Sequence, residues 1–245
     1  MIIIDEAQDM TLLYYNLCHR VINSHTKVCI LGDKFQSIYT FNGADERFIV
    51  FANIIFKGAP LPYVCTKLST SYRITNEMVL FLNKVVLKCD RINAVKNGPK
   101  PRYVFSAYEL GAYNEVKHQL NYYKPTDIFI LAASVRTGPR SPIRKLANRL
   151  SADGISIYIP MDDDKKLDDE VLNGKLVFSS FHQAKGLERK CIIVYGFDES
   201  YYKYYNKKAR RDICPNEIYV AVTRASMQLS VIHSNNNRYL PFLDS

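Results

Sequence analysis

Apolar and polar positions along the 245-residue chain alternate in blocks that predict strands and helices in turn. Residues 2–5, "IIID", and residues 27–33, "KVCILGD", are short apolar runs typical of strands covered on both faces. Between them, residues 10–25 carry apolar side chains at helical spacing. Residues 47–56, "RFIVFANIIF", fit a helix or a strand, because periodicity does not separate the two in so short a run.

A second series of elements begins near Val64, which predicts a boundary between residues 1–63 and 64–245. Apolar runs predict strands and longer amphipathic stretches predict helices. The strands fall at 127–134, 155–160, 175–196 (two strands around a loop) and 228–234, and the helices at 74–89, 109–123, 143–154 and from 216. This alternation predicts an α/β fold with largely parallel strands flanked by helices.

The composition predicts a folded protein with a basic surface. Apolar residues make up 47% of the chain and charged residues 23%, which is enough for a substantial core. The formal net charge is +9, from 33 basic and 24 acidic side chains. A polyanionic partner fits this charge, but a basic surface alone does not establish one.

The six cysteines are scattered, without a C-x-x-C pair or a Cys/His group at zinc spacing. We interpret them as reduced thiols inside a cell. No apolar stretch is long enough to span a bilayer, and "MIII" is too short for a signal peptide. The sequence therefore predicts a soluble intracellular protein, in the cytoplasm or nucleus, without a membrane partner.

Two acids, Asp5 and Glu6, directly follow the first predicted strand. An aspartate at the carboxyl end of a strand can hold Mg²⁺, which prefers carboxylate and phosphate oxygens. A glutamate beside it can polarise an attacking water. The alternative is the N-terminus of a helix, where acids are favourable, and the two letters alone favour that alternative.

Five blocks give these acids a context. They are "IIIDEAQD" (2–9), "VCILGDKFQSIYTFNGAD" (28–45), "KLSTSYRIT" (67–75), "VFSSFHQAKGLERKCIIVYG" (177–196) and "NEIYVAVTRASMQL" (216–229). In this order they resemble motifs two to six of the UvrD/Rep/PcrA-type superfamily-one helicases. The second block is the most specific, through its spacing of Gly-Asp, Gln-Ser-Ile-Tyr, an aromatic residue and Gly-Ala. The resemblance covers nearly the whole chain.

The resemblance implies two RecA-like domains that hold ATP and Mg²⁺ and move along single-stranded DNA or bind a single/double-strand junction. Residues 1–63 would be the later part of the first domain. Residues 64–245 would be a near-complete second domain without the large insertion of longer relatives. In this reading Asp5 binds Mg²⁺, Glu6 is the catalytic base and Gln36 contacts the terminal phosphate of ATP.

The resemblance also assigns roles in the second domain. Arg73 and Arg224 would be arginine fingers, since a guanidinium neutralises the charge that phosphoryl transfer spreads over the γ-oxygens. Glu188, in "KGLE", would bind the sugar or phosphate edge of the nucleotide. For either arginine taken alone, a salt bridge is the more common explanation; the ordered motifs reverse that preference.

Three residues would contact or sense nucleic acid. Phe41 stands where the family usually has a tryptophan on which a base stacks, and core packing is the equally weighted local alternative. Tyr39 would support the same loop. His182, in "FHQAKG", would couple the nucleotide to the DNA, although a lone histidine is usually structural.

Two charged stretches receive the simpler interpretation. Residues 201–211, "YYKYYNKKARR", mix aromatic and basic residues as single-strand contacts do, but a partly packed loop is favoured. Residues 162–170, "DDDKKLDDE", lack the fixed spacing of metal ligands and are predicted to form a solvated loop.

The sequence also departs from the family. No "GxxxxGK[ST]" (Walker A) loop occurs, so the amides and lysine that cradle the β- and γ-phosphates are absent. Asn42 replaces an arginine common in motif three, and "SYRI" replaces "NYRS". We expect that the Walker A loop lies on a separate polypeptide or in a longer reading frame, or that it has been lost. The main hypothesis is part of an ATP-dependent helicase; the alternative is a nucleic-acid- or protein-binding remnant without ATP turnover.

Overall fold

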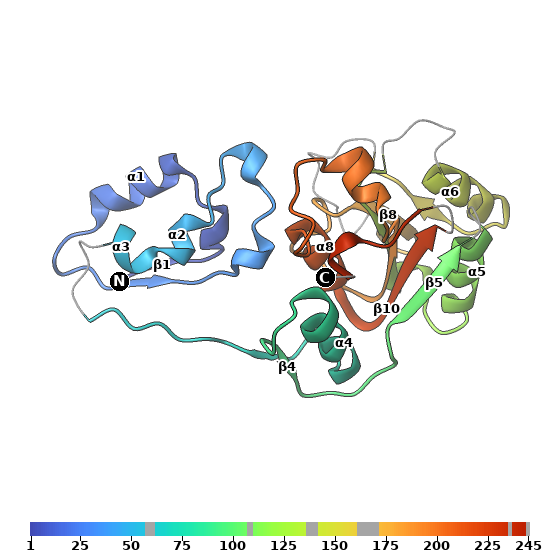
Figure 1. The fold of residues 1–245 in the computed structure, drawn as a ribbon, viewed down its shortest axis with the longest axis horizontal. Helices are drawn as coiled ribbons and strands as arrows, with labels where there is room; N and C mark the ends of the chain where they lie inside the picture. The colour runs from blue at the N-terminus through green and yellow to red at the C-terminus, as the bar shows by residue number, and fades with distance from the viewer. Residues whose placement is uncertain (57–61, 107–109, 136–141, 161–171, 235–236, 244–245) are drawn as a thin grey trace. The chain divides into compact units, whose positions relative to one another are not determined.

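The computed structural model describes residues 1–56, 62–106, 110–135, 142–160, 172–234 and 237–243. The acidic stretch 162–170 lies outside these residues. The chain divides into two compact units, Met1–Leu68 (unit 1) and Ser69–Ser245 (unit 2), each of which is described by itself. Figure 1 shows the path of the chain through both units.

In the described part of unit 1, two short parallel strands pair, β1 (Ile2–Ile4) and β2 (Val28–Ile30). The helix α1 (Leu12–Val21) connects them and begins after Thr11, whose hydroxyl accepts a hydrogen bond from the Tyr14 amide. The ambiguous run 47–56 forms two short helices, α2 (Arg47–Val50) and α3 (Ala52–Ile55). The small core contains Ile4, Ala7, Met10, Phe48, Ala52 and Phe56.

Among the described residues of unit 2, six parallel strands form one sheet in the order β5-β10-β9-β6-β8-β7. They are β5 (Arg102–Ser106), β6 (Ile128–Ala132), β7 (Ile157–Tyr158), β8 (Leu176–Ser180), β9 (Arg189–Tyr195) and β10 (Ala225–Ser234). A separate parallel pair is made by β3 (Thr70–Ser71) and β4 (Asn93–Ala94). The predicted α/β fold with parallel strands is confirmed.

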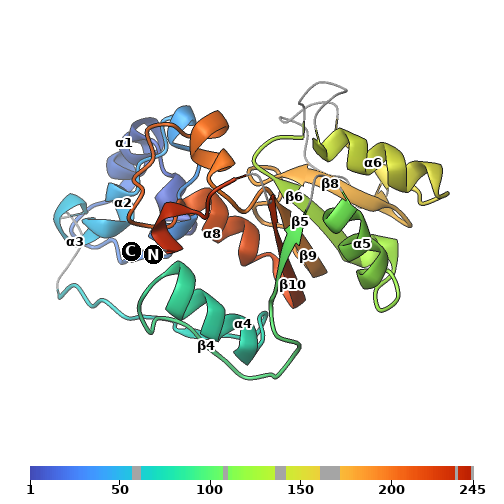
Figure 2. The same cartoon turned by 45° about the vertical axis from the view of Figure 1, so that its right-hand side comes forward.

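Helices cover both faces of the large sheet. Figure 2 shows α5 (Leu110–Gln119) and α6 (Pro142–Ala152) on one side and α8 (Asn216–Val222) on the other. The face under α5 and α6 is a continuous apolar cluster that includes Val116, Ile130, Leu146, Phe178 and Ile193. A further helix, α4 (Asn76–Phe81), continues into a π-helical turn at Leu82–Val86.

One buried carboxylate ties the edge strand β5 to this layer. Glu115 on α5 is 3% exposed and accepts hydrogen bonds from Arg102 Nε at 2.9 Å, Gln119 Nε2 at 2.7 Å and Ser230 Oγ at 2.7 Å. Burial by itself raises the pKa of Glu115, but these donors outweigh it and hold the pKa below its usual value. The group therefore remains charged in the folded protein at neutral pH.

The C-terminal segment contributes apolar side chains to the protein interior. Leu240 and Phe242 are fully buried, and the last described turn is Pro241–Leu243. Among the described residues, no helix has both the length and the apolar character that crossing a membrane requires.

Candidate functional site

The carboxyl ends of β1 and β2 form the chemically richest edge of unit 1. The Leu31 amide donates to the Ile4 carbonyl at 2.8 Å, and the Ala7 amide donates back to the Leu31 carbonyl at 2.9 Å. Asp5 and Glu6, which follow β1, therefore lie at the same edge as Asp33, which follows β2. In open α/β sheets this edge is where ligands bind.

Asp5 and Glu6 are both exposed at this edge. The Glu6 amide donates to Asp5 Oδ1 at 2.8 Å, and Glu6 adopts a left-handed backbone with φ of 51° and ψ of 40°. A non-glycine residue in that region carries strain of about 1–3 kcal/mol, which surrounding contacts must offset. Such strain is common at functional sites, where it fixes the direction of a side chain.

Behind the acids lies Gln8, which is fully buried. Its Nε2 donates to Glu6 Oε2, and its Oε1 accepts from the Asp33 amide at 3.0 Å. Asp33 in turn accepts from the Phe35 amide at 3.0 Å and from Gln36 Nε2 at 3.2 Å. One series of hydrogen bonds therefore runs from Glu6 through Gln8 and Asp33 to Gln36.

The edge suits a metal–phosphate ligand better than a bare metal ion. No three His, Cys, Asp or Glu side chains in the described part of the chain gather closely enough to enclose a metal. Mg²⁺ is usually held by one or two carboxylates together with phosphate oxygens and water. The exposed Asp5 carboxylate fits such a role.

The aromatic residues of motif three follow in a short turn at Thr40–Asn42. Phe41 is 69% exposed, so it does not pack into the core. Its ring meets that of Tyr39 edge-on, with centroids 6.1 Å apart. Tyr39 is half-buried and supports the exposed ring, which presents a face to solvent.

In unit 2, Arg73 and Glu188 form an ion pair with Nε and Oε2 2.5 Å apart. Both side chains remain partly exposed, at 40% and 55%. Arg73 lies in the turn between β3 and α4, where Ser71 Oγ accepts from its amide at 3.3 Å. Thr75, which caps α4, ends this turn. The ion pair joins two of the predicted site residues.

Arg224 follows the motif-six helix α8, two residues after its end at Val222, and is 2% exposed. Its Nε donates to the Val220 carbonyl at 3.1 Å, so the guanidinium folds back onto the last turn of α8. The Arg224 carbonyl accepts from the Arg189 amide at 3.2 Å. Because Ala225 pairs with Arg189, Glu188 and Arg224 precede neighbouring strands at the same sheet edge.

His182 occupies a different place in unit 2. It follows the carboxyl end of β8, whereas Glu188 precedes the amino end of β9, and the two strands run parallel to β6 between them. His182 therefore lies toward the carboxyl ends of the strands, and Glu188 lies toward their amino ends. The His182 side chain is half-buried.

The stretch 201–211 divides into a buried and an exposed part. Tyr201 and Tyr202 are buried, and burial raises the pKa of both phenols. Tyr204 is 64% exposed, and the Arg211 guanidinium lies 5.4 Å from the centre of the Tyr202 ring. The stretch is partly packed, as the sequence favoured, but Tyr201–Tyr205 form a π-helical turn rather than a loop.

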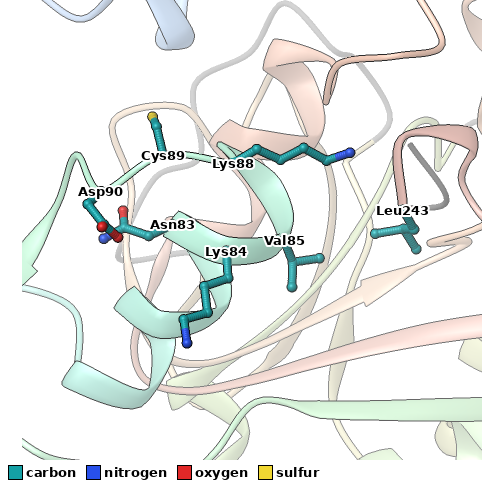
Figure 3. A pocket seen from close by; sticks show the side chains of 7 residues that line it. All are labelled: Asn83, Lys84, Val85, Lys88, Cys89, Asp90 and Leu243. Carbon is teal, nitrogen blue, oxygen red and sulfur yellow. The ribbon is translucent and has the colours of Figure 1, made fainter.

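A pocket of about 550 Å³ opens elsewhere in unit 2, beside the π-helical turn. The described residues that line it include none of the predicted site residues; they are Asn83, Lys84, Val85, Lys88, Cys89, Asp90 and Leu243. Figure 3 shows the ammonium groups of Lys84 and Lys88 pointing in different directions, so they do not converge on one anion. The carboxylate edge of unit 1 remains the better candidate.

Gln8 and Asp33 are site residues to which the sequence alone gave no role. Gln8 lies within "DEAQD" and Asp33 within the Gly-Asp of motif three, so both were visible as letters. Their connection spans 25 residues and depends on the pairing of β1 with β2.

Parts of the chain are similar to known proteins. Residues 1–54 match the model of the UvrD/REP helicase N-terminal domain. YjcD of Bacillus subtilis is 33% identical over 87 residues, and the ATP-dependent DNA helicase UvrD2 of Mycobacterium tuberculosis is 30% identical over 84 residues. These segments are 36% and 34% of this chain but 11% of each relative.

A solved structure described as the C-terminal domain of a possible DNA helicase from Lactobacillus plantarum WCFS1 is also similar. It is 19% identical with a TM-score of 0.49, over 71% of this chain and 92% of the other. The family model and the curated relatives confirm the resemblance that the motifs predicted. Residues 1–54 and the segments that match the curated helicases are thus similar to UvrD/Rep-type superfamily-one helicases.

Proposed function

We propose that this chain is part of an ATP-dependent DNA helicase that couples ATP hydrolysis to movement on single-stranded DNA. The observation that carries the proposal is the carboxyl edge of β1 and β2, where Glu6, Gln8, Asp33 and Gln36 are joined by hydrogen bonds. Phosphoryl transfer is catalysed mainly by positioning and by electrostatic stabilisation, and a connected set of polar groups supplies both.

Each group of this edge has a proposed part in hydrolysis. Asp5 binds the Mg²⁺ that accompanies the triphosphate, because it is an exposed carboxylate at a strand end. Glu6 orients the attacking water and accepts its proton. Gln36 contacts the terminal phosphate, and its hydrogen bond to Asp33 holds the side chain near the acids.

The residues of unit 2 supply charge to the same reaction. Arg73 and Arg224 are proposed to neutralise the γ-phosphate, and Glu188 to bind the nucleotide's sugar or phosphate edge. In the structure Arg73 is paired with Glu188 and Arg224 is folded onto its own helix. Arg73 would therefore exchange its carboxylate partner for a phosphate, and Arg224 would turn its remaining N–H donors away from α8.

Single-stranded DNA is the proposed track. The exposed ring of Phe41 offers a stacking surface, and base stacking on an aromatic side chain contributes about 1–3 kcal/mol per base. Tyr39 supports that ring, and His182 is proposed to transmit the nucleotide state to the DNA. The net charge of +9 favours a phosphate backbone as the partner.

Turnover requires a phosphate-binding loop in addition to these residues. The printed sequence has no Walker A motif, so we propose that a Walker A segment, in a longer chain or on a second polypeptide, completes the first domain. Residues 1–63 would then be the later part of that domain and residues 64–245 the second one.

The test is DNA-stimulated ATP hydrolysis by this chain, alone and mixed with a polypeptide that carries the Walker A part of the first domain. We expect no turnover alone and turnover in the mixture. Glu6→Gln should abolish at least 99% of it, since a general base contributes about 10²–10⁴ in rate. Glu46→Gln, at an exposed glutamate without a proposed role, is the matched control. Full turnover with Glu6→Gln would refute the assignment.

A binding module without ATP turnover is the second candidate. It is favoured by the burial of Arg224 and by the pairing of Arg73 with Glu188, which give both cations partners within unit 2. This candidate predicts single-strand binding that weakens steeply with salt and is unaffected by ATP. ATP-dependent changes in DNA affinity would exclude it.

A further inference from the structure

We propose that Gln8 is a positioning residue that holds the general base Glu6 and the phosphate-contacting loop of Gln36 in one fixed arrangement. The inference rests on the proposed function, because it assigns a purpose to a side chain behind those two residues. Gln8 itself is buried and does not reach solvent. It acts through its neighbours rather than on the nucleotide.

The hydrogen bonds of Gln8 reach three separate points. Its Nε2 donates to Glu6 Oε2, its Oε1 accepts from the Asp33 amide at 3.0 Å, and its carbonyl accepts from Ser37 Oγ at 3.2 Å. A buried amide without partners is costly, by roughly 1–3 kcal/mol in proteins. Here both ends of the side chain are satisfied, each by a different segment of the site.

The end of β2 is shaped around this side chain. A Cβ atom on Gly32 would lie 2.4 Å from Gln8 Oε1 and 2.7 Å from Ile49 Cδ1. A side chain there would displace the Gln8 amide from its present position, so glycine leaves the space that this amide occupies. The glycine of the Gly-Asp pair thus lets the Asp33 amide approach Gln8 closely enough to donate to it.

The backbone conformation of Glu6 directs its carboxylate, which the side-chain amide of Gln8 then binds. Glu6 is left-handed, with φ of 51°, and the first turn after it is closed by the Asp9 amide donating to the Glu6 carbonyl at 2.8 Å. Donation from Gln8 to Oε2 fixes the carboxylate and leaves Oε1 to face a water. An amide suits this task, since it orients a carboxylate without titrating.

The same amide connects the base with the phosphate contact. Asp33, held through its backbone by Gln8, accepts from Gln36 Nε2 through its side chain at 3.2 Å. A shift of Gln8 would therefore move both the base and the group that contacts the γ-phosphate. Misplacement of reacting groups by about 1 Å can cost roughly 100-fold in rate.

The first experiment needs no ATP and uses this chain alone. Hydrogen exchange of the Asp33 amide is compared in the wild type, Gln8→Leu and Gln8→Glu. Leucine removes both hydrogen bonds at similar volume, and glutamate keeps an acceptor for Asp33 while losing the donor to Glu6. We expect exchange about tenfold faster or more in Gln8→Leu and near the wild-type rate in Gln8→Glu.

The Leu31 amide, which donates to Ile4 across the strand pair, is the internal reference for unit 1. Its exchange should change little in either variant if the unit remains folded. Equal Asp33 exchange in the wild type and Gln8→Leu would overturn the inference. Should Gln8→Leu unfold unit 1, Gln8→Met, which also lacks the bonds but is more flexible, replaces it.

The second experiment measures turnover in the mixture with the Walker A polypeptide. Gln8→Leu and Gln8→Glu should both lower kcat by about 10–100-fold, with KM for ATP within about threefold of the wild type. Gln228→Leu, at another buried and hydrogen-bonded glutamine, is the matched control in unit 2 and should retain kcat. If the wild type is active and Gln8→Leu is equally active, the positioning role is contradicted. If the wild type itself is inactive, the proposed function is contradicted instead.

Discussion

The two units hold their predicted site residues in opposite ways. In unit 1 the polar groups support one another and still present Asp5 and Glu6 to solvent. In unit 2 the cations already have internal partners: Arg73 is ion-paired with Glu188, and Arg224 donates a hydrogen bond to the Val220 carbonyl. The first region is thus organised before a ligand arrives, whereas the proposed function requires the second to exchange internal partners for a phosphate. Preorganised groups lose less free energy to rearrangement on binding.

The strongest test of this difference is Arg224→Ala. If Arg224 leaves its helix to contact the γ-phosphate, its removal should lower kcat in the mixture by roughly 10³–10⁵, the contribution of an arginine finger. Arg224→Lys should not restore activity, since an ammonium lacks the guanidinium fork. Thermal unfolding of both variants must be followed, because Arg224 is buried. Normal turnover by a folded Arg224→Ala protein would assign the residue to the structure of α8 alone.

Stability gives a second test, confined to unit 2. Replacing Glu115 by leucine removes the carboxylate that binds Arg102, Gln119 and Ser230, and should lower the free energy of unfolding by about 1–3 kcal/mol at pH 7. Because the folded pKa of Glu115 is lowered, its contribution is present above the unfolded pKa near 4.5 and disappears as the pH falls through the folded pKa.

Urea unfolding of wild type and Glu115→Leu at pH 7 and at successively lower pH values checks this sign. The difference between the two proteins should be largest at pH 7 and shrink once the pH falls below about 4.5. A difference that grows on acidification would mean that the carboxylate is destabilising in the fold. Gln183→Leu, at a half-buried glutamine outside this cluster, serves as the control.

Much of the fold could be predicted because its central strands are continuous apolar runs. β1, β2, β6, β9 and the core of β10 all carry that pattern. The edge strand β5 was not predicted, since Tyr103 and Phe105 are exposed and the apolar run 103–105 is short and flanked by polar residues. An edge strand is covered on fewer sides, so its sequence carries a weaker signal.

The site was only partly predictable for a different reason. Motif spacing pointed to Glu6, Gln36, Arg73 and Arg224, but spacing contains no information on side-chain direction. It did not reveal that Arg224 turns back onto Val220, nor that Gln8 bridges two strand ends. Both facts depend on three-dimensional contacts: the first on the last turn of a helix, the second on residues 25 positions apart.

A smaller effect is expected at the exposed aromatic residue of unit 1. Phe41→Ala should weaken binding of an oligothymidine single strand by about 1–3 kcal/mol if one base stacks on the ring. Tyr204→Ala, at an aromatic residue of similar exposure in unit 2, is the matched control and should bind as the wild type does. Fluorescence anisotropy at two salt concentrations measures both. Equal losses in the two variants would indicate contacts spread over the basic surface rather than a stacking position.

The smallest effect concerns the ion pair that distinguishes unit 2 from unit 1. Glu188→Gln removes the charge that neutralises Arg73 and also the proposed contact with the nucleotide. An exposed pair contributes little to stability, so the fold should be unaffected. We expect KM for ATP in the mixture to rise about tenfold, equivalent to about 1.4 kcal/mol of lost binding, because the contact outweighs the release of Arg73. A KM that falls would show that Glu188 competes with the triphosphate for Arg73, and the ion pair would then restrain nucleotide binding. Arg73→Ala in the Glu188→Gln background separates the two, since competition requires the arginine and the nucleotide contact does not.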